Sequence, residues 1–228
     1  MITLIEKPIH VLHQETVKEL VEANLAREEK IVDTLLENLK AHRPTYEHSQ
    51  RTACYFEKFI EFVQEVDKEE DKPLRFSQQT KQRVGRIAKV HDIGKLFILE
   101  LVDKTEDFTQ KDGENLVELH TTYGANILAV KYQLPEEYVA TALFHHENFI
   151  GNGRPFQLKG EKIPILASAF SVIDRYDAAG TRTHKAGMIR NSEAVFQDIN
   201  STFGKELDPQ WKEPFRRFFN WHAMQGRK

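Results

Sequence analysis

Side chains of the types that bind metals occupy core-facing positions in five predicted helices of this 228-residue chain. The apolar residues of each helix recur at spacings of three and four, which is the period of one helix face. One histidine or aspartate continues each apolar stripe: His48, His91, His120, His146 and Asp174. A buried imidazole or carboxylate is costly unless it is paired or bound to an ion. A single one could be a satisfied core residue, but five together predict helices that converge on a shared polar centre.

The same periodicity predicts an all-α fold, a helical bundle with an N-terminal helical extension. In the helix expected over residues 114–131, the pattern places Leu119, Tyr123 and Val130 on the same face as His120. Residues 2–12 are expected to form a short strand or an arm. We interpret residues 1–44 as an N-terminal arm and helix, through which two copies could form a homodimer, and residues 45–228 as one domain. The other helices are expected over about 15–41, 45–66, 77–91, 135–146, 164–178 and 192–204, and from 208 onward.

Composition excludes several classes of function. The net charge is −3 with acidic and basic residues well mixed, so we expect neither a nucleic-acid polymer nor a membrane surface as partner. The single cysteine, Cys54, allows no internal disulfide and no thiolate metal cluster. No apolar run approaches the roughly 20 residues that span a bilayer, and the N-terminus lacks a signal-peptide pattern. We therefore expect a cytoplasmic protein.

The segment His91-Asp92-Ile93-Gly94-Lys95 is the densest concentration of this chemistry. Adjacent His91 and Asp92 can reach one metal ion or a close pair, because a carboxylate can bridge two ions. Gly94 allows a sharp backbone turn directly after them. Lys95 adds a positive charge that a phosphate oxygen could use. The segment therefore indicates metal-assisted chemistry on a phosphate.

The whole candidate ligand set offers nitrogen and oxygen but no sulfur. Five imidazoles and two carboxylates suit two ions of octahedral type better than one tetrahedral zinc. Such ligands favour Fe or Mn, with Zn, Ni and Co as alternatives. The candidate ligands are His48, His91, Asp92, His120, His145, His146 and Asp174.

Six segments, taken in order, resemble the HD-GYP family, a branch of the HD-domain metal-dependent phosphohydrolases that degrades cyclic di-GMP. The order and approximate spacing hold from residue 45 to about 215. The segments are HSQRTA (48–53), HDIGK (91–95), LVDKTEDFTQKD (101–112), ELHTTYGANIL (118–128), HHENFIGNGRP (145–155) and IPILASAFSVIDRYDAAGTRTHKA (163–186).

The resemblance implies an HD-domain bundle around a dinuclear metal centre. It assigns His48, His91, Asp92 and Asp174 to one ion, and His120, His145 and His146 to the other, with Asp92 bridging. Lys95 would then meet the scissile phosphate, so Asp92 and Lys95 are the expected catalytic residues. Arg182 and Lys185 lie where the family has a basic pair that contacts phosphate, although the intervening loop is shorter here.

Three positions depart from the family pattern. Gly153-Arg154-Pro155 replaces Gly-Tyr-Pro, and Ile150-Gly151 replaces the Asp-Gly that usually precedes it. Some members bind a third ion through a glutamate at the position of Pro44, so two ions are expected here. Arg154 lies shortly after the histidine pair, on a loop expected to form the rim of the pocket, where its guanidinium could stack on a base or pair with a phosphate.

These features predict a phosphodiesterase that linearises cyclic di-GMP to pGpG, with further hydrolysis to GMP left open. One alternative keeps the enzyme class and changes the substrate to another cyclic dinucleotide or nucleotide. Another is a metal-bound sensor that binds a cyclic dinucleotide without turnover. The acid that protonates the leaving oxygen is not identified. Glu147 and Asp177 are candidates, and the competing interpretation for both is support of the metal ligands or a solvated helix end.

Overall fold

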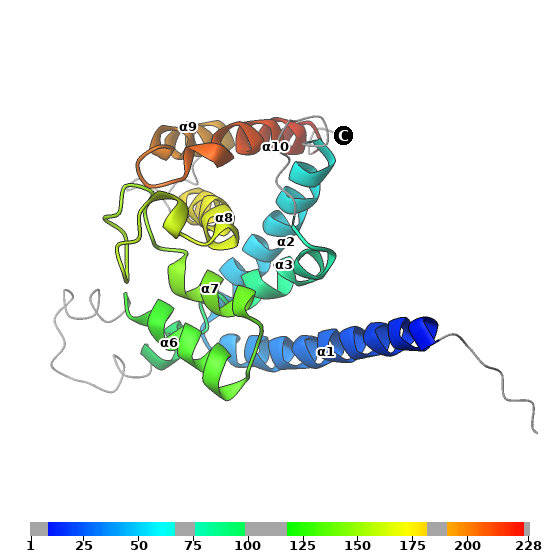
Figure 1. The fold of residues 1–228 in the computed structure, drawn as a ribbon. Helices are drawn as coiled ribbons and strands as arrows, with labels where there is room; N and C mark the ends of the chain where they lie inside the picture. The colour runs from blue at the N-terminus through cyan, green and yellow to red at the C-terminus, as the bar shows by residue number, and fades with distance from the viewer. Residues whose placement is uncertain (1–8, 67–75, 99–117, 182–190, 226–228) are drawn as a thin grey trace, which may run out of the picture.

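The computed structural model describes residues 9–66, 76–98, 118–181 and 191–225, and all the regular elements within these ranges are helices (Figure 1). The predicted all-α fold is thereby confirmed. The elements are α1 (Ile9–Leu39), α2 (Arg43–Val66), α3 (Gln78–Val90), α6 (His120–Asn126), the π-helix η2 (Ile127–Lys131), α7 (Glu136–Phe144), the 3-10 helix η3 (Gly160–Lys162), α8 (Ile165–Thr181), α9 (Ser192–Thr202), the 3-10 helix η4 (Pro209–Trp211) and α10 (Lys212–Gln225).

Helix α1 is one continuous helix that begins at Ile9, so the strand or arm expected over residues 2–12 is wrong for residues 9–12. Its C-terminal part is buried through Val32 and Leu35, whereas Val17 and Leu20 nearer its start are exposed. Figure 1 shows this first part projecting away from the bundle. The boundary between residues 1–44 and 45–228 stays a prediction, and the C-terminal turns of α1 belong to the hydrophobic core.

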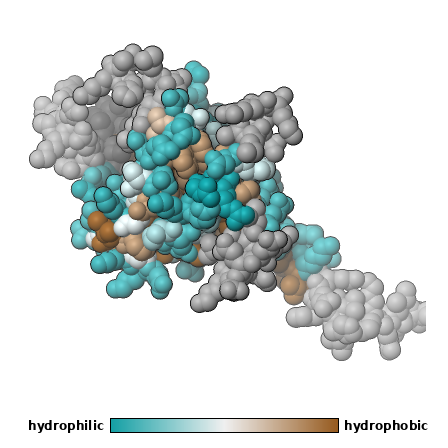
Figure 2. Space-filling view, turned by 90° about the horizontal axis from the view of Figure 1, so that it is seen from above, coloured by the Kyte–Doolittle hydropathy of each residue, from teal (hydrophilic) through white to brown (hydrophobic). Residues whose placement is uncertain are grey.

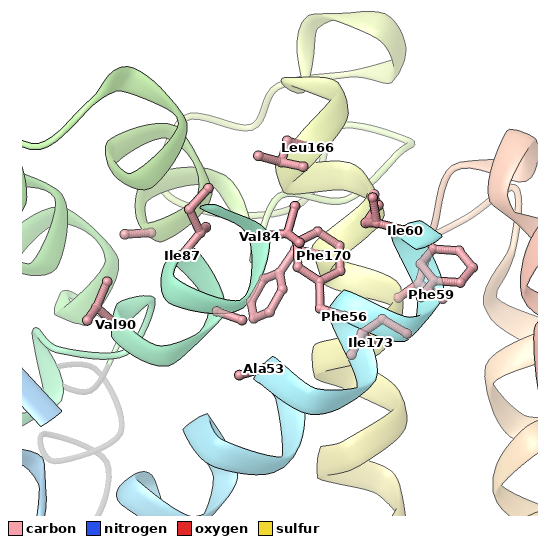
Figure 3. Packing of buried hydrophobic residues seen from close by; sticks show 14 of the residues in the cluster. Ala53, Phe56, Phe59, Ile60, Val84, Ile87, Val90, Leu166, Phe170 and Ile173 are labelled. Carbon is pink, nitrogen blue, oxygen red and sulfur yellow. The ribbon is translucent and has the colours of Figure 1, made fainter. Parts of the chain in front are cut away.

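The core is built where α2, α3 and α8 pack together (Figure 3). Phe56 of α2 and Phe170 of α8 meet edge to face with ring centroids 5.2 Å apart, and Val84 and Ile87 of α3 are buried beside them. Edge-to-face aromatic pairs add stabilisation beyond the area they bury. These three helices therefore form a rigid frame for the residues at their ends.

A cap and a buried ion pair fix the helices that precede the candidate ligands. Ser77 caps α3 as predicted, because its hydroxyl accepts a hydrogen bond from the Thr80 amide at 3.0 Å. The buried carboxylate of Glu28 on α1 accepts two hydrogen bonds from Arg83 of α3, at 2.8 and 2.9 Å. It also accepts one from the Tyr138 hydroxyl of α7, at 3.1 Å. This network fixes α1 to the two helices that end in the ligand pairs.

The predicted inward face of the α6–η2 segment was only partly right. His120 is buried, but Leu119, Tyr123 and Val130 are exposed. The residues buried with His120 are Thr121, Gly124, Ala125 and Leu128. Where this segment lies directly against the turn after α3, the backbones of Gly94 and Gly124 meet so closely that a side chain on Gly94 would collide with His120.

Helices α9 and α10 cover α8 and α2 on the opposite side of the bundle from α1 (Figure 1). Trp211, Phe215 and Phe218 are buried there, as the sequence pattern predicted. Figure 2 shows that hydrophilic residues predominate on the face seen from above, with hydrophobic residues in separate patches. Within the described ranges, the molecule offers no helix of the length and apolar character that crossing a bilayer requires.

Candidate metal centre

The bundle brings the seven predicted ligands together from five helices. Helix α2 supplies His48 and α8 supplies Asp174, while His120 is the first residue of α6. The pairs His91-Asp92 and His145-His146 directly follow α3 and α7. Helix ends can deliver two adjacent side chains to one point, which a regular helix cannot do because its neighbouring residues point about 100° apart.

The ligand atoms form two groups. In the first group, atoms of His48, His91 and Asp92 lie within 4.8 Å of one another, and Asp174 Oδ1 lies 2.9 Å from His48 Nε2. In the second group, atoms of His120, His145 and His146 lie within 4.8 Å of one another. This division is the one that the family resemblance implies.

Asp92 lies between the two groups. Its Oδ2 is 3.3 Å from His91 Nε2, and its Oδ1 is 3.1 Å from His120 Nε2 and 3.8 Å from His145 Nε2. Each carboxylate oxygen therefore faces a different set of imidazoles. A bridging carboxylate requires this placement.

Buried atoms at the centre lack hydrogen bonds. His91 Nε2 and Asp92 Oδ1 are both inaccessible to solvent, and neither makes a hydrogen bond to any described residue. Leaving such atoms unsatisfied costs about 1–3 kcal/mol each. A divalent ion in each group would satisfy them, so the residues present fit two metal ions.

Backbone hydrogen bonds orient the buried imidazoles. His91 Nδ1 donates to the Ala88 carbonyl at 2.7 Å, and His145 Nδ1 donates to the Ala142 carbonyl at 3.0 Å. A proton on Nδ1 leaves Nε2 as the ligating nitrogen, and in both residues Nε2 faces Asp92. The ends of α3 and α7 thus fix which ring atom each histidine presents.

The two groups differ in charge. Burial lowers the pKa of His91, but Asp92 and Asp174 outweigh burial and raise that pKa to about 10. In the second group burial dominates, so it lowers the pKa of His146 to about 4 and the pKa of His145 well below its ordinary value. His145 and His146 consequently offer neutral imidazoles with lone pairs, which is the form that binds metals.

Asp177 supports His48 from behind. His48 Nδ1 donates to Asp177 Oδ2 at 2.7 Å, and Arg51 donates to both oxygens of this buried carboxylate at 2.8 and 3.0 Å. Burial raises the pKa of Asp177, but the hydrogen bonds from His48 and Arg51 outweigh burial and hold it below its ordinary value. An ionised carboxylate does not donate a proton, so the structure favours ligand support over an acid role for Asp177.

Glu147 fastens the loop that follows the histidine pair. Its buried carboxylate accepts hydrogen bonds from the Phe156 amide at 2.6 Å and the Leu158 amide at 2.9 Å. The Arg154 amide donates to the His146 carbonyl at 3.1 Å, and a Cβ at Gly153 would collide with the Glu147 backbone. Glu147 is therefore engaged in shaping the loop rather than in facing a substrate.

Lys95 contacts Asp92 and borders a cavity of about 340 Å³. The cavity also touches His48 and is lined by Pro44 and Ile98. Burial lowers the pKa of Lys95, but the Asp92 carboxylate outweighs burial and raises the pKa above its ordinary value. Lys95 thus places a permanent positive charge where the cavity meets the first ligand group.

Arg154 lies on the rim of a second cavity, of about 440 Å³, which reaches His146 on the other side of the centre. Arg154 forms an exposed ion pair with Glu118. The predicted rim position agrees with this placement, although the ion pair was not predicted. The other predicted phosphate contacts, Arg182 and Lys185, lie outside the described residues.

Sequence reasoning did not single out Arg175 or Glu206, which both line this second cavity. Arg175 directly follows Asp174 on α8, and its place in an inward-facing helix could have marked it. Glu206 lies in the turn between α9 and η4, and no local pattern indicates that it reaches the loop after α7. Only the fold brings them together.

Comparison with known proteins identifies the family. A family model described as an HD domain matches residues 35–211. The chain belongs to the HD domain family. The match begins inside α1 and ends at η4, so it contains all seven candidate ligands of this HD domain.

Curated relatives of this HD domain carry phosphodiesterase names. The chain is 26% identical over 173 residues to the 3′3′-cGAMP-specific phosphodiesterase 2 of Vibrio cholerae serotype O1. The aligned region covers 75% of this chain and 31% of that relative. It is 33% identical over 132 residues to a cyclic di-GMP phosphodiesterase of Thermotoga maritima, and this alignment covers 56% of this chain and 35% of that relative. The chain thus spans about a third of the length of these relatives.

Among solved structures, a cyclic GMP-AMP specific phosphodiesterase of V. cholerae superposes with a TM-score of 0.59 at 18% identity. The superposition covers 85% of this chain and 48% of that one. At this level of identity the likeness supports the fold alone.

Proposed function

We propose that this chain is a metal-dependent phosphodiesterase of the HD-GYP type, which hydrolyses cyclic di-GMP to linear pGpG. The observation that carries the proposal is the position of Asp92 between two groups of ligands. His48, His91, Asp92 and Asp174 would hold one ion, and His120, His145 and His146 the other, with Asp92 shared. Iron or manganese suits these nitrogen and oxygen ligands best.

Two bound divalent ions would supply a water of lowered pKa and positive charge beside the phosphoryl oxygens. The residues of the chain position and enclose the substrate. Lys95 would present its ammonium group to an equatorial phosphoryl oxygen from the side of the first cavity, where negative charge develops during the reaction. Phe170 packs against the ring of His91, with ring centroids 4.7 Å apart, and so shields that side of the first ligand group from solvent.

Substrate contacts outside the centre are also part of the proposal. Arg154 would hold the substrate from the rim of the second cavity, and Arg182 and Lys185 would meet phosphate oxygens. Residues 1–44 would form the arm and helix through which two copies pair. The exposed apolar residues Val17 and Leu20 of α1 support that pairing.

A second candidate substrate is 3′3′-cGAMP. It is favoured by the name of the V. cholerae relative whose alignment covers 75% of this chain. Both candidates are cyclic dinucleotides with the same phosphodiester backbone, so the centre around Asp92 does not distinguish them. Only contacts to the bases can.

Turnover under anaerobic conditions tests the proposal. The purified protein would be reconstituted with Fe(II) or Mn(II) and supplied with cyclic di-GMP, 3′3′-cGAMP or cyclic di-AMP, and the products separated by chromatography. We expect a linear dinucleotide from cyclic di-GMP. Turnover of 3′3′-cGAMP alone would favour the second candidate. Binding without any hydrolysis in the metal-loaded protein would contradict the enzyme and identify a sensor.

A further inference from the structure

The cavity on the His146 side of the centre has a polar wall. It measures about 440 Å³ and is bounded by the loop after His146, by Arg175 of α8 and by Glu206 of the turn after α9. A nucleobase attached to a nucleotide whose phosphate lies at the metal centre would extend into one of the neighbouring cavities. This one has the volume for a base, and its wall carries the carboxylate, guanidinium and amide groups that can read a base edge.

The Glu206 carboxylate is held in place within this wall. Arg175 donates one amino group to Glu206 Oε2 and the other to Asn148 Oδ1, the latter at 2.6 Å. The backbone of the same turn is joined to the loop, because the Phe149 amide donates to the Glu206 carbonyl at 3.0 Å. The Glu206 side chain is nevertheless 44% exposed, so its carboxylate can accept further hydrogen bonds from a ligand.

A second carboxylate, that of Glu118, also reaches the cavity but is less firmly held. Its partner Arg154 has a side chain that is 59% exposed, whereas the side chain of Arg175 is only 24% exposed. A residue that distinguishes ligands needs a fixed position, because a mobile carboxylate can turn away from the wrong one. Glu206 is therefore the better candidate for recognising a base.

A carboxylate can only accept hydrogen bonds. On its Watson–Crick edge guanine presents two neighbouring donors, the N1 proton and the 2-amino group, which match the two oxygens of one carboxylate. Adenine presents a 6-amino donor beside the N1 acceptor, and that lone pair would face a negative oxygen. Proteins that bind unpaired nucleotides commonly read bases on this edge.

We propose that this cavity holds one base of the cyclic dinucleotide and that Glu206, positioned by Arg175, selects guanine over adenine. The inference rests on the proposed function, since it assumes a nucleotide at the neighbouring centre. It assigns to Glu206 a contact with the base and to Arg175 the role of fixing that carboxylate.

Nucleotide binding tests the inference without turnover. Calorimetry would compare guanosine and adenosine 5′-monophosphate on the purified protein and on Glu206→Gln. We expect the unaltered protein to bind the guanine nucleotide at least about tenfold more tightly, because guanine offers the carboxylate a charge-assisted hydrogen bond that adenine N1 cannot donate. In Glu206→Gln the preference should fall at least about tenfold, because an amide can donate to adenine N1 and accept from its amino group.

Glu213→Gln on α10 is the matched control, because Glu213 also pairs with an arginine, Arg216, and does not line the cavity. It should retain the parent preference. Equal binding of the two nucleotides by the unaltered protein would overturn the inference, and so would an unchanged preference in a folded Glu206→Gln. If that variant does not fold by circular dichroism, the comparison on the unaltered protein still decides.

A base-free diester separates this inference from the proposed function. Bis(p-nitrophenyl) phosphate would be supplied to the metal-loaded, unaltered protein. If the protein hydrolyses neither this diester nor any cyclic dinucleotide, the proposed phosphodiesterase function is contradicted, whatever the nucleotide preference. Hydrolysis of the diester with no preference for guanine would keep the phosphodiesterase and remove Glu206 as the selecting residue.

Discussion

Gly94 lies so close to His120 that a Cβ on Gly94 would collide with the His120 carbonyl oxygen. Gly124, one turn further along α6, packs against the amide nitrogen of Gly94. This backbone contact brings His120 Nε2 to within 3.1 Å of Asp92 Oδ1. Residues 91–94 form the turn that the sequence predicted, but the φ angle of Gly94 is not positive. The close approach of two chain segments is what requires glycine there.

Gly94→Ala is therefore expected to push α6 away from Asp92. Overpacking of this kind costs about 1–3 kcal/mol, so the melting temperature should fall by several degrees. The metal content of the second group should fall as well. Elemental analysis and thermal unfolding measure the two effects. The control is Gly180→Ala on α8, where a Cβ would meet nothing within 4 Å, so the melting temperature should be unchanged or higher.

Metal stoichiometry tests the bridging role of Asp92. We expect two ions per chain in the reconstituted protein, one for each ligand group. Asp92→Ala should lose both, because each group loses an oxygen ligand, whereas His146→Ala should retain the ion of the first group. Elemental analysis after gel filtration measures this, with Asp33→Ala on the exposed face of α1 as control. Full metal content and full activity in Asp92→Ala would contradict the assignment.

Asp177→Asn should weaken metal binding in the first group without removing a ligand. The neutral amide loses the charge that orients His48 and pairs with Arg51. Loss of such support typically lowers metal affinity by about 10–100-fold. Competition with a chelator would measure the affinity. The second group should keep its affinity, and equal loss from both groups would indicate general unfolding instead.

Lys95→Ala is expected to lower kcat by about 10²–10³-fold while metal content stays close to that of the parent. The reason is that Lys95 contacts the Asp92 carboxylate from the cavity and belongs to neither ligand group. Steady-state kinetics and elemental analysis on the same preparation separate the two quantities. Lys81→Ala, an exposed lysine on α3, serves as control. Loss of metal in Lys95→Ala, or unchanged kinetics, would refute a direct role in turnover.

Arg154→Ala should raise KM for a cyclic dinucleotide severalfold and leave kcat little changed, which is the signature of lost uniform binding. The dependence of KM on salt should also weaken, because an exposed charge is screened by ions. Glu118→Gln removes the partner of Arg154 and should change KM in the opposite direction. An unaltered KM and salt response in Arg154→Ala would remove this residue from the substrate site.

The sequence by itself determined the helical class and the identity of the candidate ligands. Helical periodicity is a local property, so His48, His91 and Asp174 could be assigned to inward faces before any fold was known. Adjacent candidate ligands at helix ends, such as His145 and His146, could be identified from the sequence in the same way. Each prediction needed only a short stretch of chain and the high cost of burying an unpaired polar group.

Only the tertiary structure decided the contacts between distant segments. The sequence placed Leu119, Tyr123 and Val130 inward because they are apolar, but the packing of α6 against Gly94 turns Gly124 inward and leaves those three residues exposed. In the same way, Arg175 and Glu206 are 31 residues apart and meet because the turn after α9 folds back onto the loop after α7. Such contacts depend on how whole helices pack, and no local pattern records that geometry.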